Sequence, residues 1–362
     1  MSSRRREPKS DGSVTIKGVA ELAGVSMMTV SRVLNEGASV RESTRKKVME
    51  AVAELGYRPN ISARSLAGSR SYLIGLLYDN PSAAYISELL IGALNSCRAA
   101  GYHLVVEACD MEAGGIGEEV LALVRDSRLD GLVLPPPLCE SEALVEALTG
   151  ADIPYVRIAP FTQTEVAPYV YIDDAQAAHE VTSRLIALGH SRIGFIKGHP
   201  NQGASESRFK GFRRAMRAAG LAVKAEDICQ GYFSYKSGLA CAEKLLDRKD
   251  RPTAIFASND DMAAAVYAVA NRHGLEIPAD LSVAGFDDTL IATTVWPQLT
   301  TVRQPIAEMA AAAVDLLIRV VRSGRAVDDR GMARRLLDYT IIERESLGPA
   351  PRATPRKQAQ SR

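Results

Sequence analysis

Residues 24–35 present side chains suited to DNA contacts on one face of a short helical segment. Val30, Val33 and Leu34 recur at helical spacing and would face inward, which leaves another set facing outward. In a helix-turn-helix, outward residues at the start of the second helix meet base edges in the major groove. Arg32 suits guanine, whereas methionine lacks paired donors and would contact thymine methyl groups or sense DNA shape. The outward set is Met27, Met28, Ser31 and Arg32.

Neighbouring elements must hold that segment in place. Apolar spacing predicts a first helix over about 15–23, Gly24 fits the left-handed turn after it, and Ser26 can cap the second helix. A third helix is predicted over 43–55, starting at a capping serine or threonine, and a weakly helical segment follows at 61–69. An ordinary helical hairpin is the competing interpretation, and these neighbours favour a DNA-binding one.

A second group of candidates suits a small polar ligand. Arg208 offers forked donors and Asp287 offers paired acceptors, which together match the hydroxyl groups of a sugar. Asn259 follows an apolar run, where its amide can both donate and accept. A structural ion pair between Arg208 and Asp287 is the alternative interpretation.

Enzyme chemistry finds little support in the residue pattern. Acidic pairs at 173–174, 260–261 and 287–288 could hold Mg²⁺, but such pairs more often cap helices. The five histidines are scattered, and no Walker-type or G-x-G-x-x-G loop occurs. We therefore expect no catalytic residues, no metal site and no cofactor. A plain sugar carrier and an α/β enzyme with a DNA-targeting head remain as alternatives.

Beyond residue 71, short apolar runs alternate with helical stretches. Continuous apolar strands between helices indicate parallel sheets covered on both faces. The rhythm restarts near residue 169, which predicts two doubly wound halves with a cleft for one small molecule between them. The predicted strands are 73–77, 103–106, 131–134, 155–158, 169–172, 192–196, 253–257 and 281–285, with a last strand at 336–343.

Charge is distributed unevenly along the chain. The net charge is +1, but residues 1–70 carry 13 Lys and Arg against 7 Asp and Glu, and residues 71–350 carry 27 against 36. A basic head on an acidic body indicates nucleic acid at one end only. Five scattered cysteines without a C-x-x-C pair suggest neither a disulfide framework nor a zinc site. Without a secretory signal or a long apolar stretch, we expect a cytoplasmic protein with no membrane partner.

Motifs in both regions resemble one family, the LacI/GalR transcriptional regulators. The resemblance implies an N-terminal all-α helix-turn-helix domain with a hinge helix, followed by an α/β sensor of two doubly wound parallel-sheet subdomains similar to periplasmic binding proteins. It also implies a dimeric, effector-controlled, nucleoid-associated repressor. The motifs are 14–17, 19–20, 23–26, 29–35, 44–45 and 55–60 in the head, and 188–196, 208–212, 258–260, 282–288, 299–302 and 343–346 in the body.

For the head, the resemblance implies a DNA-binding surface along the second helix and the hinge. Leu66 matches a leucine that wedges into the minor groove, and Ala63 matches the small residue beside it. Prying a base step open costs a few kcal/mol, which the contacts to bent DNA offset. The implied DNA-binding residues are Thr15, Ser26, Met27, Met28, Thr29, Ser31, Arg32, Asn35, Tyr57, Asn60, Ala63, Arg64 and Leu66.

For the body, the resemblance implies an effector pocket with a sugar or glycoside as the leading ligand. Ala159 stands where many relatives have an aspartate, and Pro135 stands where others have a polar side chain, so the first wall is less polar. Arg157 would compensate if it points into the cleft, although it could equally face a helix. The implied effector-binding residues are Tyr85, Pro135, Arg157, Arg208, Phe233, Asn259 and Asp287.

The expected organisation has five parts. They are a disordered basic N-terminus (1–13), a DNA-binding domain (14–60), a hinge (61–70), an effector-binding and dimerisation domain (71–348) and a disordered tail (349–362). Subdomain one would cover about 71–172 and 302–324, and subdomain two about 173–300 and 332–348. A homodimer would bind a pseudo-palindromic operator, and the sequence leaves open whether the effector induces or co-represses.

Overall fold

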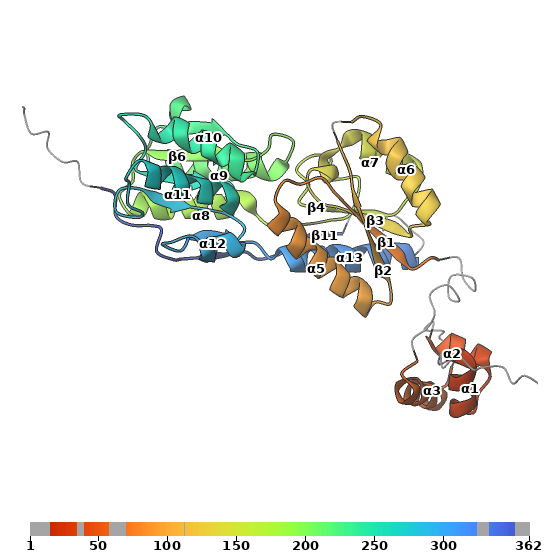
Figure 1. The fold of residues 1–362 in the computed structure, drawn as a ribbon. Helices are drawn as coiled ribbons and strands as arrows, with labels where there is room; N and C mark the ends of the chain where they lie inside the picture. The colour runs from red at the N-terminus through yellow and green to blue at the C-terminus, as the bar shows by residue number, and fades with distance from the viewer. Residues whose placement is uncertain (1–14, 35–39, 58–69, 112, 324–332, 352–362) are drawn as a thin grey trace, which may run out of the picture. The chain divides into compact units, whose positions relative to one another are not determined.

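The computed structural model describes residues 15–34, 40–57, 70–111, 113–323 and 333–351 (Figure 1). The chain forms two compact units, the head within residues 1–71 and the sensor within residues 72–362. The N-terminus 1–13, most of the hinge 61–70 and most of the tail 349–362 lie outside the described residues. None of the helices in the described residues combines the length and the hydrophobicity of a membrane-spanning segment.

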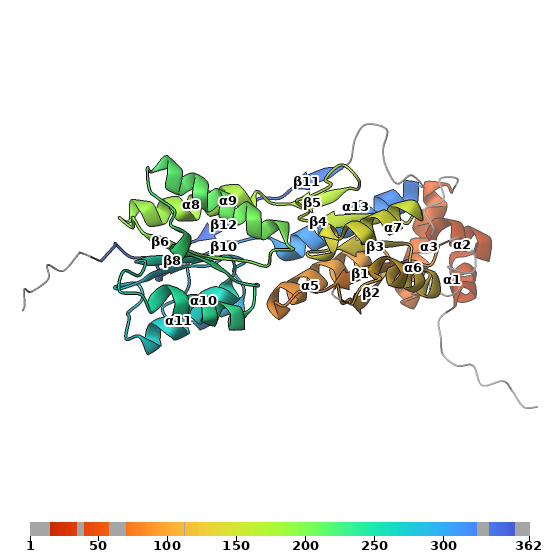
Figure 2. The same ribbon diagram turned by 90° about the horizontal axis from the view of Figure 1, so that it is seen from above.

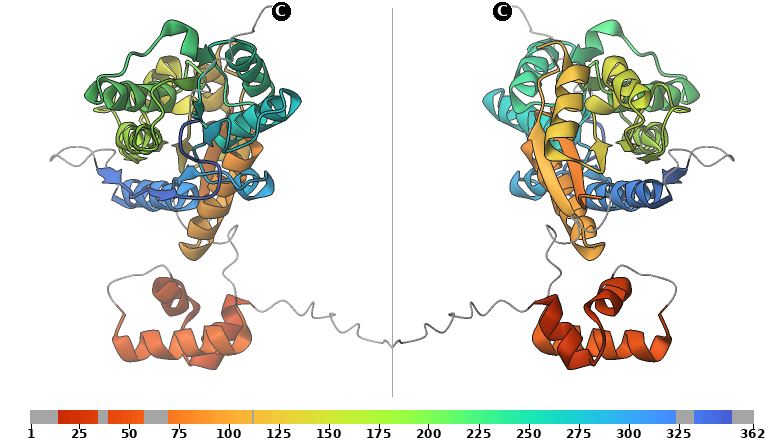
Figure 3. Two further views of the ribbon diagram at one scale, coloured as in Figure 1. Left: turned by 90° about the vertical axis from the view of Figure 1, so that its left-hand side faces the viewer. Right: turned by 90° about the vertical axis from the view of Figure 1, so that its right-hand side faces the viewer.

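The described residues of the head form three short helices: α1 (Ile16–Ala23), α2 (Met27–Leu34) and α3 (Glu42–Leu55) (Figure 3). Gly24 ends α1 in the left-handed conformation at φ 65°, which confirms the predicted turn. The predicted serine or threonine cap of α3 is wrong, because Arg41 precedes the helix and gives no side-chain cap. Glu42 in the first turn complements the helix dipole there. The buried core of the head is Val19, Ala20, Val30, Val33, Val48 and Ala51.

The first lobe of the sensor is a six-stranded parallel sheet in the order β11-β5-β4-β3-β1-β2. Helices α5 and α13 cover one face, and α6 and α7 cover the other (Figure 1). The strands are β1 (Leu73–Tyr78), β2 (His103–Ala108), β3 (Gly131–Leu134), β4 (Tyr155–Ile158), β5 (Tyr169–Tyr171) and β11 (Arg334–Leu336). The helices are α5 (Ala83–Ala99), α6 (Ile116–Ser127), η1 (Leu138–Glu140), α7 (Glu142–Gly150) and α13 (Ile306–Ser323).

The second lobe is a four-stranded parallel sheet in the order β7-β6-β8-β9. Helices α8 and α9 pack together on one face, and α10 and α11 on the other (Figure 2). The strands are β6 (Ile193–Lys197), β7 (Ile228–Gln230), β8 (Ala254–Ala257) and β9 (Ser282–Ala284). The helices are α8 (Asp174–Ala187), α9 (Gly203–Ala218), η2 (Ala225–Asp227), α10 (Tyr235–Leu246), α11 (Asp260–Arg272) and α12 (Leu290–Thr294).

Three chain segments connect the lobes. They are the passage from β5 into α8, the passage from β10 (Thr301–Arg303) into α13, and the passage from β11 into β12 (Thr340–Ile342). The predicted single strand at 336–343 is wrong, because β11 pairs with β5 of the first lobe while β12 pairs with β10. The boundary of subdomain two at residue 332 is therefore also wrong, and β11 belongs to subdomain one.

Candidate functional sites in the head and in the sensor cleft

The recognition face of the head is the exposed side of α2. Ser26 caps this helix, since its Oγ accepts a hydrogen bond from the backbone N–H of Thr29 at 3.1 Å. The cap fixes the first turn, where the side chains of Met27 and Met28 are 53% and 65% exposed and Arg32 is exposed one turn later. These apolar and cationic side chains do not pack in the core of the head. They therefore form an exposed surface that is suited to contacts with base edges.

The remaining head predictions fall into three groups. Thr15 is exposed and caps α1 by accepting from the N–H of Gly18 at 3.4 Å. Thr29 and Ser31 are half-buried on α2, and Tyr57 packs on the core of the head. The predictions outside the described residues are Asn35, Asn60, Ala63, Arg64 and Leu66.

A small cavity lies between the two lobes of the sensor. Five predicted effector-binding residues line it together: Tyr85, Arg208, Phe233, Asn259 and Asp287. The first lobe adds Asn80, Ser82, Pro136 and Ala159, the second adds Asp174, Gln202 and Ala204, and the segment after β10 adds Gln304. Five of the thirteen wall residues were therefore predicted from the sequence, and the other eight were missed.

Arg208 is the central charged group of the cavity. It is buried on α9, and its Nε donates to Asp174 Oδ1 at 2.8 Å while its Nη1 donates to the carbonyl of Ser258 at 2.6 Å. Nη1 also lies 3.7 Å from Asp287 Oδ1, and the guanidinium carbon lies 3.5 Å from the ring centre of Phe286. The ion pair with Asp287 therefore exists and forms part of the cavity wall.

Two acidic groups share this guanidinium. Burial raises the pKa of Asp287 to about 7, although Arg208 and a 2.6 Å hydrogen bond from Gln304 Nε2 act in the opposite direction. Burial also raises the pKa of Asp174, again against the effect of Arg208. Near neutral pH, Asp287 can therefore accept from a ligand hydroxyl when ionised and donate to one when protonated.

Backbone conformation marks the same cavity. Ala159, Phe233 and Asp287 all line it with positive φ values of 51°, 57° and 114°. A residue with a Cβ pays of order 1–3 kcal/mol for such a conformation, and these residues cluster at ligand sites in folded proteins. The unfavourable backbone conformations at three wall positions support the interpretation of this cavity as a ligand site.

Asn259 and Phe233 form one part of the wall as a unit. Asn259 Oδ1 accepts from the N–H of Met262 at 3.0 Å, which caps α11, and its Nδ2 donates to the carbonyl of Phe233 at 3.0 Å. A Cβ added at Gly198 would overlap the ring of Phe233, so a glycine is needed beneath that ring. The Asn259 amide thus positions the aromatic wall.

Tyr85 provides the aromatic wall of the first lobe. Its backbone N–H lies at the N-terminus of α5, which Ser82 caps. Burial raises the pKa of Tyr85 above its ordinary value, so the phenol stays protonated and keeps a donor.

Arg157 and Pro135 do not line the cavity, and these two predictions are corrected. Arg157 is fully buried and donates to three backbone carbonyls, those of Cys139, Thr162 and Gln163, at 2.7–2.9 Å. Its donors therefore order the loop after β4 instead of facing a ligand. Pro136, one residue after Pro135, lies on the wall.

Contacts across the cleft hold the lobes together. Ser82 Oγ of the first lobe donates to Asp261 Oδ2 of the second at 2.8 Å. Phe161 of the first lobe packs on the first turn of α9, where a Cβ at Gly203 would overlap it. The cavity measures about 30 Å³, far below the range of about 300–1,000 Å³ that is usual for small-molecule sites.

The missed wall residues carry weak sequence signals. Asp174 stood in an acidic pair directly after a predicted strand, and the structure shows that Asp173 caps α8 while Asp174 turns to Arg208. Asp260, which belongs to another of the predicted acidic pairs, is not a wall residue. It accepts hydrogen bonds from Thr301 Oγ1 at 2.6 Å and from the N–H of Thr289 at 2.8 Å. In the described part of the chain, no group of three or more His, Cys, Asp or Glu residues is placed to hold a metal ion.

A helix-turn-helix head with an exposed recognition helix, joined to a two-lobed receptor with a polar cavity, defines a ligand-responsive DNA-binding regulator. The family model for bacterial regulatory proteins of the lacI family matches residues 15–60, and the model for a periplasmic binding protein-like domain matches residues 182–347. The chain belongs to the LacI family of transcriptional regulators.

Relatives and solved structures agree with this assignment. Catabolite control protein A of Priestia megaterium is 37% identical over 310 residues, which are 84% of this chain and 92% of the relative. HTH-type transcriptional regulator DegA of Bacillus subtilis (strain 168) is 36% identical over 299 residues, which are 82% of this chain and 88% of the relative. The lac repressor dimer bound to operator and the anti-inducer ONPF has a TM-score of 0.71 at 29% identity. The match covers 93% of this chain and 99% of the repressor chain. A CelR–cellobiose complex has a TM-score of 0.70 at 30% identity, covering 92% and 99%.

Proposed function

We propose that this regulator is a repressor that binds a pseudo-palindromic operator as a homodimer, and that a sugar or glycoside in the sensor cleft controls this binding. It would act in the cytoplasm, on the nucleoid. The observation that carries the proposal is the cavity between two lobes, where Arg208, Asp174 and Asp287 face aromatic walls. The guanidinium and carboxylate groups can form paired hydrogen bonds with the hydroxyl groups of a sugar, and the aromatic side chains can cover a face of its ring.

Operator choice would come from α2. Lysines and arginines of the basic head neutralise phosphates and provide most of the affinity, while Met27, Met28 and Arg32 contact base edges. One head alone would bind weakly. Two heads joined in a dimer bind much more tightly, because the second binding event becomes intramolecular.

Large apolar side chains are exposed at two places on the sensor, one in each lobe. Ile91 and Leu94 of α5 are 52% and 43% exposed, and Leu290 and Trp296 around α12 are 81% and 80% exposed. The proposed homodimer interface would cover such side chains where they gather into one patch. Trp296 is the single tryptophan of the chain, so its fluorescence reports directly on burial at this surface.

Effector control would act through the lobes. The cavity of about 30 Å³ admits a sugar only after the lobes open, and the Ser82–Asp261 hydrogen bond must break in that step. The CelR–cellobiose complex provides a structural relative with a sugar ligand. An effector shifts the operator-binding equilibrium only by its difference in affinity for the open and closed states.

The test is footprinting of the full chain on the DNA around its own gene, with and without a panel of sugars and glycosides. We expect one protected pseudo-palindrome whose occupancy changes at least tenfold with one of these compounds. The absence of any sequence preference, whatever compound is added, would refute the proposal. The direction of the change distinguishes an inducer from a co-repressor.

Two variants separate the head from the sensor. Arg32→Ala should weaken operator binding while binding to random DNA falls less, because a base contact is lost and phosphate contacts remain. Asp287→Asn should keep the footprint but lose the response to the effector, since it removes an acceptor from the cavity. An unchanged response in Asp287→Asn would exclude Asp287 from the site.

A further inference from the structure

A second concave site lies on the second lobe, away from the cleft. It is a groove of about 850 Å³ along the C-terminal half of α9, the 220–228 segment and β7. It shares no wall residue with the cleft cavity, because Phe209, Arg213 and Arg217 lie on a different face of α9 from Arg208. We call it the α9–β7 groove.

The charge of the α9–β7 groove is strongly positive. Its wall contains Lys197, Arg213, Arg217 and Lys244 and no acidic residue. Lys197 Nζ pairs with Glu206 at 3.1 Å, whereas the other three cations have no ion pair within 4 Å in the described part of the chain. Arg213 and Arg217 are four residues apart on one helix and therefore neighbours on its surface. Two adjacent guanidinium forks suit phosphate or carboxylate oxygens.

The floor of the α9–β7 groove is apolar. Phe209, Leu221, Val223 and Ile228 are half-buried there and pack on the core beneath. The ring of Phe209 lies 5.4 Å from that of Phe195, which holds it in place. Lys197 Nζ lies 4.7 Å from the centre of the Phe209 ring, so cationic groups surround an aromatic surface.

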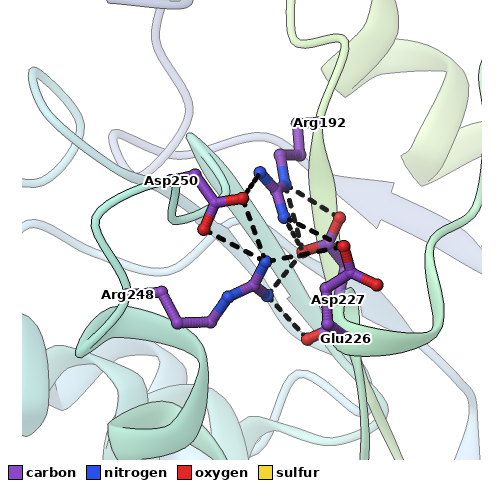
Figure 4. A network of polar contacts seen from close by, with 5 residues as sticks. All are labelled: Arg192, Glu226, Asp227, Arg248 and Asp250. Atoms are coloured by element: carbon purple, nitrogen blue, oxygen red, sulfur yellow. Dashed lines mark hydrogen bonds and ion pairs between the residues drawn. The ribbon is translucent and has the colours of Figure 1, made fainter.

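One wall of the groove is held rigidly by an ion-pair network (Figure 4). Arg192 Nε donates to Asp227 Oδ2 at 2.9 Å and Arg192 Nη1 to Asp250 Oδ2 at 2.6 Å. Arg248 Nη1 donates to Asp227 Oδ1 at 2.8 Å. Asp227 belongs to η2 and directly precedes the wall residue Ile228, so the network fixes η2 and β7 as one rim. The network also pairs the carboxylates of Asp227 and Asp250 with Arg192 and Arg248 instead of with the cations of the groove.

We propose that the α9–β7 groove is a second ligand site, specific for a small organic anion with at least two negative charges and an apolar or ring-shaped body. The anionic group would lie between Arg213, Arg217 and Lys244, and the body would cover Phe209. The volume falls within the range of about 300–1,000 Å³ that small-molecule sites occupy. Because α9 also carries Arg208, this ligand would contact the same helix as the effector.

Isothermal titration calorimetry on the full chain tests the site with three probes. Phenyl phosphate carries both the anion and the ring, inorganic phosphate carries the anion alone, and benzyl alcohol carries the ring alone. We expect phenyl phosphate to bind at least tenfold more tightly than either of the others, and its binding to weaken as salt is raised. No binding of phenyl phosphate at 10 mM, or equal binding of all three probes, would overturn the proposal.

A matched pair of double variants locates the bound anion. Arg213→Ala/Arg217→Ala removes two charges from the groove, and Lys210→Ala/Arg214→Ala removes two exposed charges from the same helix outside it. The first should weaken phenyl phosphate binding at least tenfold, and the second less than twofold. Equal losses would show a general charge effect, and an unchanged affinity in the first variant would place the ligand elsewhere. Either result overturns the proposal.

Discussion

Replacement of Arg208 by methionine tests the electrostatic design of the cleft. The variant keeps an apolar stem of similar shape against Phe286 but removes the guanidinium that lies 2.8 Å from Asp174 and 3.7 Å from Asp287. Two buried carboxylates then lack their cation. Breaking a buried ion pair by removal of one partner costs roughly 3–5 kcal/mol.

The cost can be bounded from the titration of the acids. In the variant, Asp174 would take up a proton in the folded state instead of remaining a buried anion. Holding one aspartate protonated at pH 7, about three units above its unfolded pKa of about 3.9, costs about 4 kcal/mol. Asp287 adds less to the free-energy cost at pH 7, because burial already raises its pKa to about 7. We therefore expect Arg208→Met to lose about 3–4 kcal/mol at pH 7.

The stability loss of Arg208→Met should depend on pH. The folded variant binds a proton on Asp174 that the unfolded chain releases above about pH 4, so its relative stability rises as the pH falls. At pH 5.5 the loss should be about 2 kcal/mol smaller than at pH 7. Asp174→Asn in the same chain should recover part of the loss at pH 7, because it removes the need for a proton.

Urea unfolding followed by far-ultraviolet circular dichroism measures these differences for the sensor transition. Arg214→Met, an exposed arginine on the same helix, is the matched control and should change stability by less than about 0.5 kcal/mol. A loss below 1 kcal/mol for Arg208→Met, or a loss that is the same at both pH values, would refute the assignment of Arg208 as the counter-ion of two buried acids.

Three further outcomes follow from the cleft and its lobe. Gly203→Ala should lower effector affinity in calorimetry, because its Cβ overlaps Phe161 when the lobes close; unchanged affinity would contradict this. Effector affinity should rise between pH 6 and pH 8 with a midpoint near 7 as Asp287 ionises, and an affinity that is the same at both pH values would contradict this. Burial lowers the pKa of His190 below 6.5, so the unfolded chain binds more protons and stability should fall as the pH drops below about 6.5. His190→Gln should flatten that loss in urea unfolding, and an unchanged slope would assign it to other groups.

Local patterns in the sequence determined much of this protein. The helices of the head follow from apolar spacing, and its first turn follows from Gly24 and the cap at Ser26, since each depends on residues within a few positions. The apolar strands of both lobes were predictable for the same reason. Their alternation with helices predicted a cleft, because parallel strands bring their carboxyl ends together. The resemblance to the LacI/GalR family and the chemistry of the side chains assigned Arg208 and Asp287 to that cleft.

Only the tertiary structure decided which neighbours share those side chains. Arg157 and Arg208 are both buried arginines, yet one donates to loop carbonyls and the other faces the cavity. The lobe of β11 was likewise not predictable, because a short exposed strand carries no apolar pattern and takes its place from its partner β5. Contacts between residues far apart in the chain, such as Ser82 with Asp261, depend on how the lobes pack, and no local pattern encodes that packing.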